Sequence, residues 1–355
     1  MKKRVLLGMS GGVDSSVAAV LLLEQGYEVI GATMRLWETQ CTENCNECKN
    51  QAIEDAKNVC EKLQIPHYII DSRDIFKQKV IDKFINEYEN NKTPNPCVEC
   101  NRFIKFGEFY KKAQELQCDY ISTGHYAKIE YSEKYNMNVI KKADEEKKDQ
   151  TYFLYYMPKE EIEHVLFPLQ NKVSKEEIRK IAEANNLITA HKKESQEICF
   201  IPDNDYQRFL KQYPKKQLRK GNIVLKTGEV LGKHNGLSNY TIGQRKGLGV
   251  SYKEPLYVIK LDGKNNQVIV GTEKDLYSNE LYATELNWLT MNKIEGELQL
   301  KAKIRYRSKE AECIVVPIEE DKVKVVFKEP QRAITPGQSV VFYDDDILIG
   351  GGKII

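Results

Sequence analysis

The chain has 355 residues, of which 41% are hydrophobic and 30% charged, a composition that can bury substantial cores and excludes a disordered protein. This length favours two or three domains over one. The formal net charge of +2 does not by itself indicate a nucleic-acid partner, because such binding depends on where basic residues cluster. No stretch approaches the roughly 20 apolar residues of a membrane span. We therefore expect a cytoplasmic protein with no membrane partner.

The first half of the chain alternates predicted strands with predicted helices. Strands are expected at residues 4–9, 27–34, 67–70 and 120–123, with apolar residues at helical spacing between them. Helices are expected to resume over residues 159–185. This alternation predicts an α/β fold with a doubly wound parallel sheet.

The pattern changes after Asp205, where glycines, basic residues and short β-like runs replace the helix-strand rhythm. The later strands are expected at residues 222–225, 256–261, 267–270, 298–306, 322–327 and 339–343. They fit a small antiparallel β-barrel at the C-terminus. We therefore expect an α/β domain at residues 1–205, a small central domain at 206–275 and the barrel at 276–355.

A phosphate-binding loop is predicted between the first strand and the first helix. Residues 10–15 read Ser-Gly-Gly-Val-Asp-Ser, and at a helix start the backbone N–H groups and the helix dipole can hold a phosphate. Asp14 suits a Mg²⁺ ion that bridges phosphate oxygens. A bare Gly-Gly turn is common after strands, and the Walker Gly-Lys-Ser/Thr ending is absent. The complete string in this position is what indicates an ATP site.

This string resembles the loop of the pyrophosphatase-loop (PP-loop) ATPases, which have a HUP-like fold and transfer AMP to a carbonyl-type oxygen. Other strings resemble the bacterial tRNA-specific 2-thiouridylases and spread over nearly the whole chain. These strings are residues 93–101 running into 104–107, residues 122–127, 148–154 and 198–201, and the densest match, residues 234–249.

The resemblance implies ATP-dependent 2-thiolation of the wobble uridine of tRNA, with adenylation of the uracil C2 oxygen followed by sulfur transfer from a cysteine persulfide. It implies Cys100 as the nucleophile and Cys199 as the persulfide carrier. The implied ATP ligands are Gly8, Met9, Ser10, Gly11, Gly12, Val13, Asp14, Ser15, Met34 and Gly124. Those implied near the target base are Asn95, Pro96 and Cys97. The implied tRNA contacts are His125, Lys148, Asp149, Gln150, Arg305, Tyr306 and Gln338.

The resemblance also implies two kinds of partner. One is the anticodon stem-loop of tRNA, with lysine, glutamate and glutamine tRNAs as acceptors. The other is a sulfur donor such as a cysteine desulfurase or a relay protein. A uracil C2 carbonyl is a poor electrophile, which explains the need for ATP, and a thiolate is the effective nucleophile at neutral pH.

Cys97 stands where many family members have Asp, and it creates the pattern Cys97-x-x-Cys100. Together with Cys199 this gives three thiolates, the number that can hold a [4Fe–4S] cluster with one open iron. Related tRNA thiolases use such clusters. A cluster-borne sulfide therefore stands as an alternative to the persulfide route.

The remaining cysteines fall into two groups. A second cluster, Cys41-x-x-x-Cys45-x-x-Cys48, indicates either a metal-binding insertion or an exposed loop. Small core residues are expected at Cys60, Cys118 and Cys313.

Two features indicate how RNA could be held. Basic residues recur with period two at Lys301, Lys303, Arg305, Arg307 and Lys309, so on a strand all five would project from one face and attract phosphates. Aromatic residues that could stack on splayed bases are Tyr126, Tyr152 and Tyr240.

Two other functions fit part of this pattern. One is an adenylating PP-loop enzyme that acts on a different tRNA position, which the C-terminal strings disfavour. The other is a nucleotide-regulated RNA-binding protein without catalysis. Cys100 and Cys199 distinguish this second alternative, because binding alone requires neither thiol.

Overall fold

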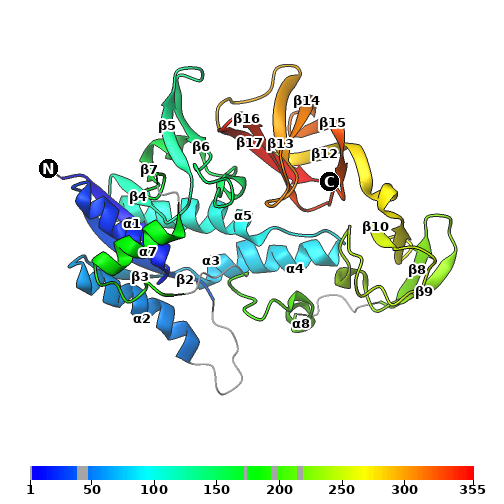
Figure 1. Ribbon diagram of the computed structural model, residues 1–355, viewed down its shortest axis with the longest axis horizontal. Helices are drawn as coiled ribbons and strands as arrows, with labels where there is room; N and C mark the ends of the chain where they lie inside the picture. Colours follow the sequence, from blue (N-terminus) through cyan, green and yellow to red (C-terminus); the bar gives the residue numbers. More distant parts are fainter. Residues whose placement is uncertain (1, 38–46, 172–173, 193–197, 214–218) are drawn as a thin grey trace. The chain divides into compact units, whose positions relative to one another are not determined.

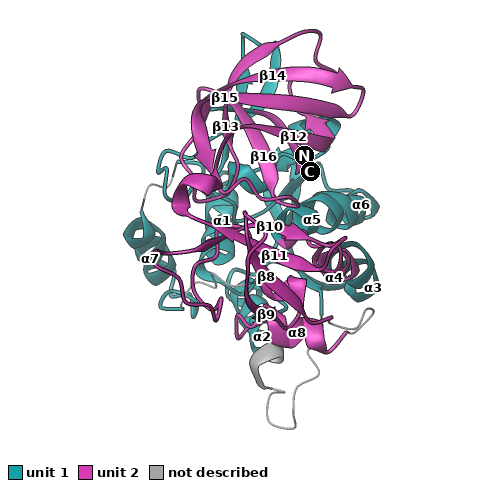
Figure 2. Cartoon of the chain, turned by 90° about the vertical axis from the view of Figure 1, so that its right-hand side faces the viewer, with its two compact units in different colours: residues 1–80, 97–200, 346–348 teal, residues 81–96, 201–345, 349–355 magenta. Residues whose placement is uncertain are grey.

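The computed structural model describes residues 2–37, 47–171, 174–192, 198–213 and 219–355. The chain divides into two compact units, shown in Figure 2. Unit 1 comprises residues 1–80, 97–200 and 346–348, and unit 2 comprises residues 81–96, 201–345 and 349–355. Cys41 and Cys45 of the second cysteine cluster lie outside the described residues, and only the backbone of Cys48 is described.

A five-stranded parallel sheet organises unit 1, as the strand-helix alternation predicts. Its strand order is β3-β2-β1-β4-β7. The strands are β1 (Arg4–Gly8), β2 (Glu28–Arg35), β3 (His67–Asp71), β4 (Tyr120–Ser122) and β7 (Val165–Leu166). The order reverses between β1 and β4, since β1 pairs with β2 on one side and β4 on the other. In open α/β sheets, ligands bind at such a switch point, beyond the carboxyl ends of the strands.

Helices and short helical segments surround this sheet. They are α1 (Val13–Glu24), α2 (Glu47–Lys62), α3 (Arg73–Phe76), α5 (Pro96–Cys100), α6 (Phe109–Glu115), α7 (Lys175–Ala184), the 3₁₀ segments η3 (Thr151–Phe153) and η4 (Lys159–His164), and the π-helical segments η1 (Lys77–Ile81) and η2 (Asn101–Glu108). One core cluster joins β1 to α1, α2 and α7. Figure 1 shows α1 and α7 side by side over the sheet. A hairpin of β5 (Lys128–Ser132) and β6 (Met137–Lys141) completes the unit.

The central region of unit 2 is a small four-stranded sheet with the order β10-β11-β8-β9. Its strands are β8 (Gly221–Leu225), β9 (Val230–His234), β10 (Tyr257–Asp262) and β11 (Gln267–Gly271). The helical segments of unit 2 are α4 (Asp82–Glu89), α8 (Tyr206–Lys211), η5 (Leu237–Asn239) and η6 (Glu273–Leu276). Leu237, Tyr240 and Leu248, from the densest motif match, pack into the core of the small sheet. Part of that motif is therefore structural.

The C-terminal region forms a closed antiparallel barrel of six strands, which confirms the predicted architecture. The strands are β12 (Tyr277–Trp288), β13 (Leu298–Lys303), β14 (Ala311–Glu319), β15 (Lys322–Arg332), β16 (Ser339–Asp344) and β17 (Ile347–Ile354). Pairing of β12 with both β15 and β17 closes the barrel.

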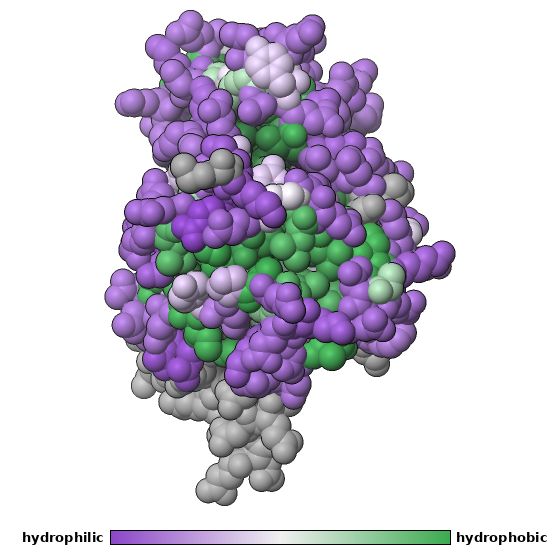
Figure 3. Space-filling view, turned by 90° about the vertical axis from the view of Figure 1, so that its left-hand side faces the viewer, coloured by the Kyte–Doolittle hydropathy of each residue, from purple (hydrophilic) through white to green (hydrophobic). Residues whose placement is uncertain are grey.

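The face that Figure 3 presents is mainly hydrophilic, with apolar residues gathered in a central band. In unit 1 the exposed large apolar side chains are Tyr68, Ile69, Tyr131 and Ile188. Among the described residues, none of the helices has the length and apolar character needed to span a membrane.

Candidate active site

The loop after β1 has a backbone that only glycine permits at one position. Gly11 has a φ of +69°, and a Cβ atom there would lie 2.2 Å from the carbonyl oxygen of Ala52 in α2. Gly12 is the N-cap of α1 and has no side chain to occupy the free N–H groups of the first turn. Since a helix start offers unpaired N–H groups and a positive dipole end, this loop can hold phosphate oxygens.

Hydroxyl groups hold the loop in shape. The Ser15 Oγ donates to the Gly12 carbonyl at 3.1 Å and accepts from the Ser10 N–H at 3.2 Å. On β2, the Thr33 hydroxyl donates to the Met9 carbonyl at 2.8 Å. These bonds lie within the loop or connect it to a neighbouring strand, so they hold the loop in this shape without a ligand.

Gly124, which follows β4, lies against the same loop. A Cβ atom at this position would be 3.1 Å from the Ser15 nitrogen and 3.3 Å from the Asp14 Cβ. The predicted ATP residues that follow β1 and β4 therefore meet at the switch point of the sheet. Met34 lies half-buried on β2, the neighbouring strand.

Asp14 points its carboxylate at a tyrosine that is 112 positions away in sequence. The Tyr126 hydroxyl donates to the Asp14 Oδ1 at 2.6 Å. Mg²⁺ is usually bound by one or two carboxylates together with substrate phosphates, so a single carboxylate at the start of α1 fits that ion.

Lys192 also contacts this loop, although none of the motifs includes it. Its ammonium donates to the Gly11 carbonyl at 2.8 Å and to the buried Asp55 carboxylate at 2.6 Å. No motif signals this contact, because it joins residues 181 positions apart.

The structure brings the three predicted site cysteines together in unit 1. Cys100 is buried at the end of α5, while Cys97 and Cys199 are exposed. The thiol of Cys199 lies close enough to those of Cys97 and Cys100 for both to raise its pKa. Phe200, the neighbour of Cys199, packs edge-on against Phe76 with 5.8 Å between ring centroids. The chain directly after Cys199 is thereby anchored.

Cys100 leads directly into the π-helical segment η2. Such segments often occur at functional sites. Asn101, which is 3% exposed, anchors the start of η2 by donating from its Nδ2 to the Phe153 carbonyl at 2.9 Å.

Burial raises the pKa of all three thiols, to about 11 for Cys100 and about 12 for Cys199. Solvent reaches Cys97 and Cys199, but the surrounding protein displaces much of the water that would stabilise a thiolate. The charge of Lys105 acts in the opposite direction on each of the three thiols. Lys105 is therefore the cation that favours the reactive thiolate form.

His125 holds Lys105 and is itself buried. The Lys105 ammonium lies 3.3 Å from the His125 Nε2, and the His125 Nδ1 lies 2.7 Å from the Thr123 hydroxyl. Burial, and then the charge of Lys105, keep the pKa of His125 well below its ordinary value. A neutral ring that accepts from Lys105 through Nε2 donates to Thr123 through Nδ1.

Replacing Lys105 with methionine should slow alkylation of Cys100 and Cys199 by iodoacetamide at pH 8 roughly three- to tenfold, equivalent to about 0.7–1.4 kcal/mol. The alkylation rate follows the thiolate fraction, and loss of the cation lifts thiol pKa values that are already above the working pH. Peptide mass analysis locates the modified cysteine. Lys105→Arg should keep most of the rate, and Lys111→Met, which removes an exposed partner of Glu108, is the control. Equal rates in Lys105→Met and the native protein would refute this role.

The three thiols do not fit an iron–sulfur cluster as they are arranged. Across the residues that the structure describes, no group of three His, Cys, Asp or Glu side chains is placed to hold a metal ion.

Three of the residues expected to contact tRNA are engaged within unit 1. His125 and Asp149 are 8% and 2% exposed. The Asp149 carboxylate accepts from the Thr151 hydroxyl at 2.8 Å, and the Gln150 Oε1 accepts from the Tyr126 N–H at 3.0 Å. These side chains shape the segment, and their contact with tRNA stays a prediction.

The predicted basic stripe is wrong beyond Lys303, where β13 ends. Lys303 itself is 6% exposed. Arg305 follows in the connection to β14, where the Ser308 hydroxyl donates to its carbonyl at 2.8 Å and forms a local turn. The five basic residues therefore do not share one strand face.

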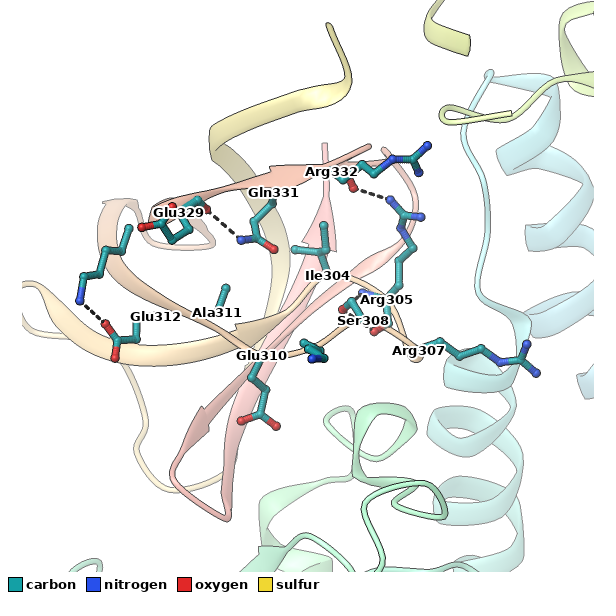
Figure 4. Close-up of a pocket in the computed structure, with 12 residues that line it drawn as sticks. Ile304, Arg305, Arg307, Ser308, Glu310, Ala311, Glu312, Glu329, Gln331 and Arg332 are labelled. Carbon is teal, nitrogen blue, oxygen red and sulfur yellow. Dashed lines mark hydrogen bonds and ion pairs between the residues drawn. The ribbon is translucent and has the colours of Figure 1, made fainter. Parts of the chain in front are cut away.

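The connection after β13 lines a cavity of about 620 Å³ in unit 2, shown in Figure 4. Arg305 points toward the backbone at Arg332, where its Nη2 donates to the Arg332 carbonyl at 2.6 Å, whereas Arg307 points away. The cationic residues around the cavity are Arg305, Arg307, Lys309, Lys328 and Arg332.

The prediction that three tyrosines stack on bases is wrong for this conformation. Tyr126, Tyr152 and Tyr240 are 5%, 0% and 8% exposed, because each ring packs into a core. Of the expected core cysteines, Cys60 and Cys313 are buried and Cys118 is half-buried.

Gln338 forms hydrogen bonds to the loop that precedes α5. Its side-chain amide donates to the Thr93 carbonyl at 3.0 Å and to the Pro94 carbonyl at 3.2 Å. The Thr93 N–H donates to the Pro336 carbonyl at 2.9 Å. Gly337 has a φ of +91°, and a Cβ atom there would lie 2.8 Å from the Thr93 oxygen. The turn before β16 therefore fixes the backbone next to Asn95.

Gln338→Ala should lower the free energy of unfolding by about 1–3 kcal/mol, since it removes two hydrogen bonds. It should also speed amide hydrogen exchange in residues 92–95. Gln331→Ala is a matched control, because that amide donates only along its own strand, to the Glu329 carbonyl. Unchanged exchange in residues 92–95 would show that Gln338 does not hold this loop.

Three family models match successive regions of the chain, and their boundaries agree with the three sheets. Residues 3–203 match the family model described as tRNA methyl transferase HUP domain, residues 207–272 the tRNA methyl transferase PRC-barrel domain, and residues 278–354 the aminomethyltransferase beta-barrel domain. A phosphate loop at a sheet switch point, within a HUP domain, places the protein in the PP-loop ATPase class.

Curated relatives narrow the class to one family. The tRNA-specific 2-thiouridylase MnmA of Acetivibrio thermocellus is 50% identical over 99% of this chain and 99% of its own length. The tRNA-specific 2-thiouridylase MnmA 1 of Caldanaerobacter subterraneus subsp. tengcongensis is 52% identical over 100% of this chain and 98% of its own. The chain therefore belongs to the tRNA-specific 2-thiouridylase family.

Proposed function

We propose that this protein is an ATP-dependent tRNA sulfurtransferase that converts the wobble uridine of the anticodon to 2-thiouridine, in the cytoplasm. The observation that carries the proposal is the grouping of Cys100 and Cys199 in the same unit as the phosphate loop. A nucleotide site activates an oxygen as a leaving group, and a thiol pair delivers and releases sulfur. Family membership supports the assignment.

In the first step the uracil C2 oxygen attacks the α-phosphorus of ATP. The bond from the α-phosphorus to the bridging oxygen breaks, and pyrophosphate leaves. The phosphate loop binds the phosphate oxygens through backbone N–H groups. Asp14 would hold a Mg²⁺ ion, which would neutralise phosphate charge.

In the second step the outer sulfur of a persulfide on Cys199 attacks C2, and AMP leaves with the electron pair of the C–O bond. The Cys100 thiolate then attacks the Cys199 Sγ. A disulfide forms between the two cysteines, the bond to the outer sulfur breaks, and its electron pair stays on the sulfur now at C2. Two thiol groups of an external reductant then reduce this disulfide and are themselves oxidised to a disulfide.

The persulfide requires a sulfur donor, for which we propose a cysteine desulfurase or a relay protein. We propose lysine, glutamate and glutamine tRNAs as acceptors, with the target base held near Asn95, Pro96 and Cys97. The cavity that Arg305 lines, next to Tyr306, has five cationic and three acidic side chains around it, and it is the proposed site of tRNA phosphate contact.

The deciding experiment combines unmodified tRNA, ATP, Mg²⁺, a persulfide donor and the protein, followed by digestion and nucleoside mass analysis. We expect 2-thiouridine that depends on ATP. Sulfur at a different position would identify another adenylating PP-loop enzyme. ATP and tRNA binding without any product would favour a nucleotide-regulated RNA-binding protein.

A further inference from the structure

The family resemblance implies that Lys148 contacts tRNA. In the structure its side chain lies beside the phosphate loop. Its ammonium lies 4.5 Å from the centre of the Tyr126 ring and donates to the Tyr126 hydroxyl at 3.4 Å. That hydroxyl has one proton, which it donates to the Asp14 Oδ1 at 2.6 Å. The three groups form a directed chain from ammonium through phenol to carboxylate.

The surrounding structure holds this chain in place. The Tyr126 ring is 5% exposed, and its backbone is pinned on both sides by Gln150, whose Oε1 accepts from the Tyr126 N–H and whose N–H donates to the Tyr126 carbonyl. The carboxylate of Asp149 is buried and accepts from the Ala143 N–H at 3.3 Å. Lys148 therefore starts from a fixed backbone and is half-buried next to Asp14.

The phosphate loop needs a cation from outside its own sequence. Residues 8–15 contain no Lys or Arg, so the loop has nothing equivalent to the lysine of a Walker motif. Lys192 touches the loop, but its ammonium is paired with the buried carboxylate of Asp55. Lys148 reaches the mouth of the loop through a half-buried side chain, where water screens charge less than at an open surface.

We propose that Lys148 is a ligand of the ATP polyphosphate and that Tyr126 is the positioning residue that sets Lys148 beside Asp14. This inference rests on the ATP dependence of the proposed function. When the bond between the α- and β-phosphates breaks, negative charge develops on the departing pyrophosphate. An ammonium group at this place stabilises that charge.

The test measures binding of Mg²⁺ and a non-hydrolysable ATP analogue without tRNA, and binding of tRNA without nucleotide, both by calorimetry. Lys148→Met should raise the Kd for the analogue about 10- to 100-fold, as expected for loss of a hydrogen bond to a charged group, and change the tRNA Kd less than twofold. Lys148→Arg should restore most of the affinity for the analogue. Lys147→Met, which removes the adjacent exposed lysine, is the matched control.

Tyr126→Phe tests the positioning role. It keeps the ring beneath the ammonium and removes only the hydroxyl, so the fold should persist, and we expect several-fold weaker binding of the analogue with no change for tRNA. Weaker tRNA binding by Lys148→Met with unchanged analogue binding would make Lys148 a tRNA contact and overturn the proposal, as would no change in either. A native protein that binds the analogue but forms no 2-thiouridine would refute the proposed function alone.

Discussion

Replacing Cys199 with serine is expected to reduce 2-thiouridine formation at least about 10³-fold, a loss of about 4 kcal/mol of transition-state stabilisation. A hydroxyl group cannot carry the outer sulfur of a persulfide, so no nucleophile reaches C2. Pyrophosphate release in the presence of tRNA should continue, because adenylation uses the phosphate loop and not the thiol. Nucleoside mass analysis and a pyrophosphate assay measure the two steps separately.

Cys100→Ser should cause a loss of similar size at a later step. Here sulfur reaches C2 but stays bonded to Cys199, so tRNA should remain attached to the protein through a disulfide that added dithiol cleaves. Dithiol should therefore restore product in Cys100→Ser and not in Cys199→Ser. Cys313→Ser in the barrel is the control and should retain activity within about threefold. A loss in Cys97→Ser as large as in the other two would contradict the two-thiol route and favour a cluster of three thiolates.

The sheet and the phosphate loop were predictable because their determinants are local. Four strands of the parallel sheet, β1 to β4, lie within one residue of the predicted segments, since each is a short run rich in apolar residues between turn signals. The fifth strand, β7, lies in a segment that was expected to be helical. Two features require glycine at position 11, a positive φ and the close approach of Ala52, and the sequence indicates only the first. The string predicts a tight turn, while the close approach of Ala52 depends on how α2 packs.

The prediction of a basic stripe on one strand face was wrong because periodicity does not show where a strand ends. Residues 301–309 keep the period-two pattern throughout, but the Ser308 hydroxyl and N–H both bond to the Arg305 carbonyl and turn the chain. Serine offers the backbone this alternative to a ladder. A single serine in an otherwise strand-like run was the available signal.

Contacts between residues far apart in sequence could not be predicted from motifs. Tyr126 reads as an aromatic available for stacking, yet its ring is buried and its hydroxyl bonds to Asp14. Lys105 lies inside a recognised string, but its place among the thiols depends on the turn of η2 and on His125. The motifs indicate the loop glycines and the three cysteines, but not that the Lys105 ammonium and the Tyr126 hydroxyl lie beside them.

A buried ion pair in unit 2 should have the largest effect on stability. Lys353 on β17 and Glu87 on α4 are 7% and 8% exposed and form a hydrogen-bonded ion pair. Lys353 also lies 3.5 Å from Glu285 on β12, which Lys83 on α4 approaches to 3.2 Å. These contacts fasten α4 to the barrel strands, and α4 leads into the loop that Gln338 grips.

Lys353→Met should lower the free energy of unfolding by about 3–5 kcal/mol, because it leaves the Glu87 carboxylate buried without its cation. Urea denaturation followed by circular dichroism measures this change. The double variant Glu87→Gln with Lys353→Met should recover most of the loss. It replaces the Glu87 carboxylate, which Lys353→Met alone leaves buried and charged without a cation. Lys322→Met, which breaks a pair with Glu319 near the surface, should change stability by less than about 0.5 kcal/mol. If the double variant were as unstable as Lys353→Met, the loss would come from packing of the lysine stem and not from the uncompensated charge.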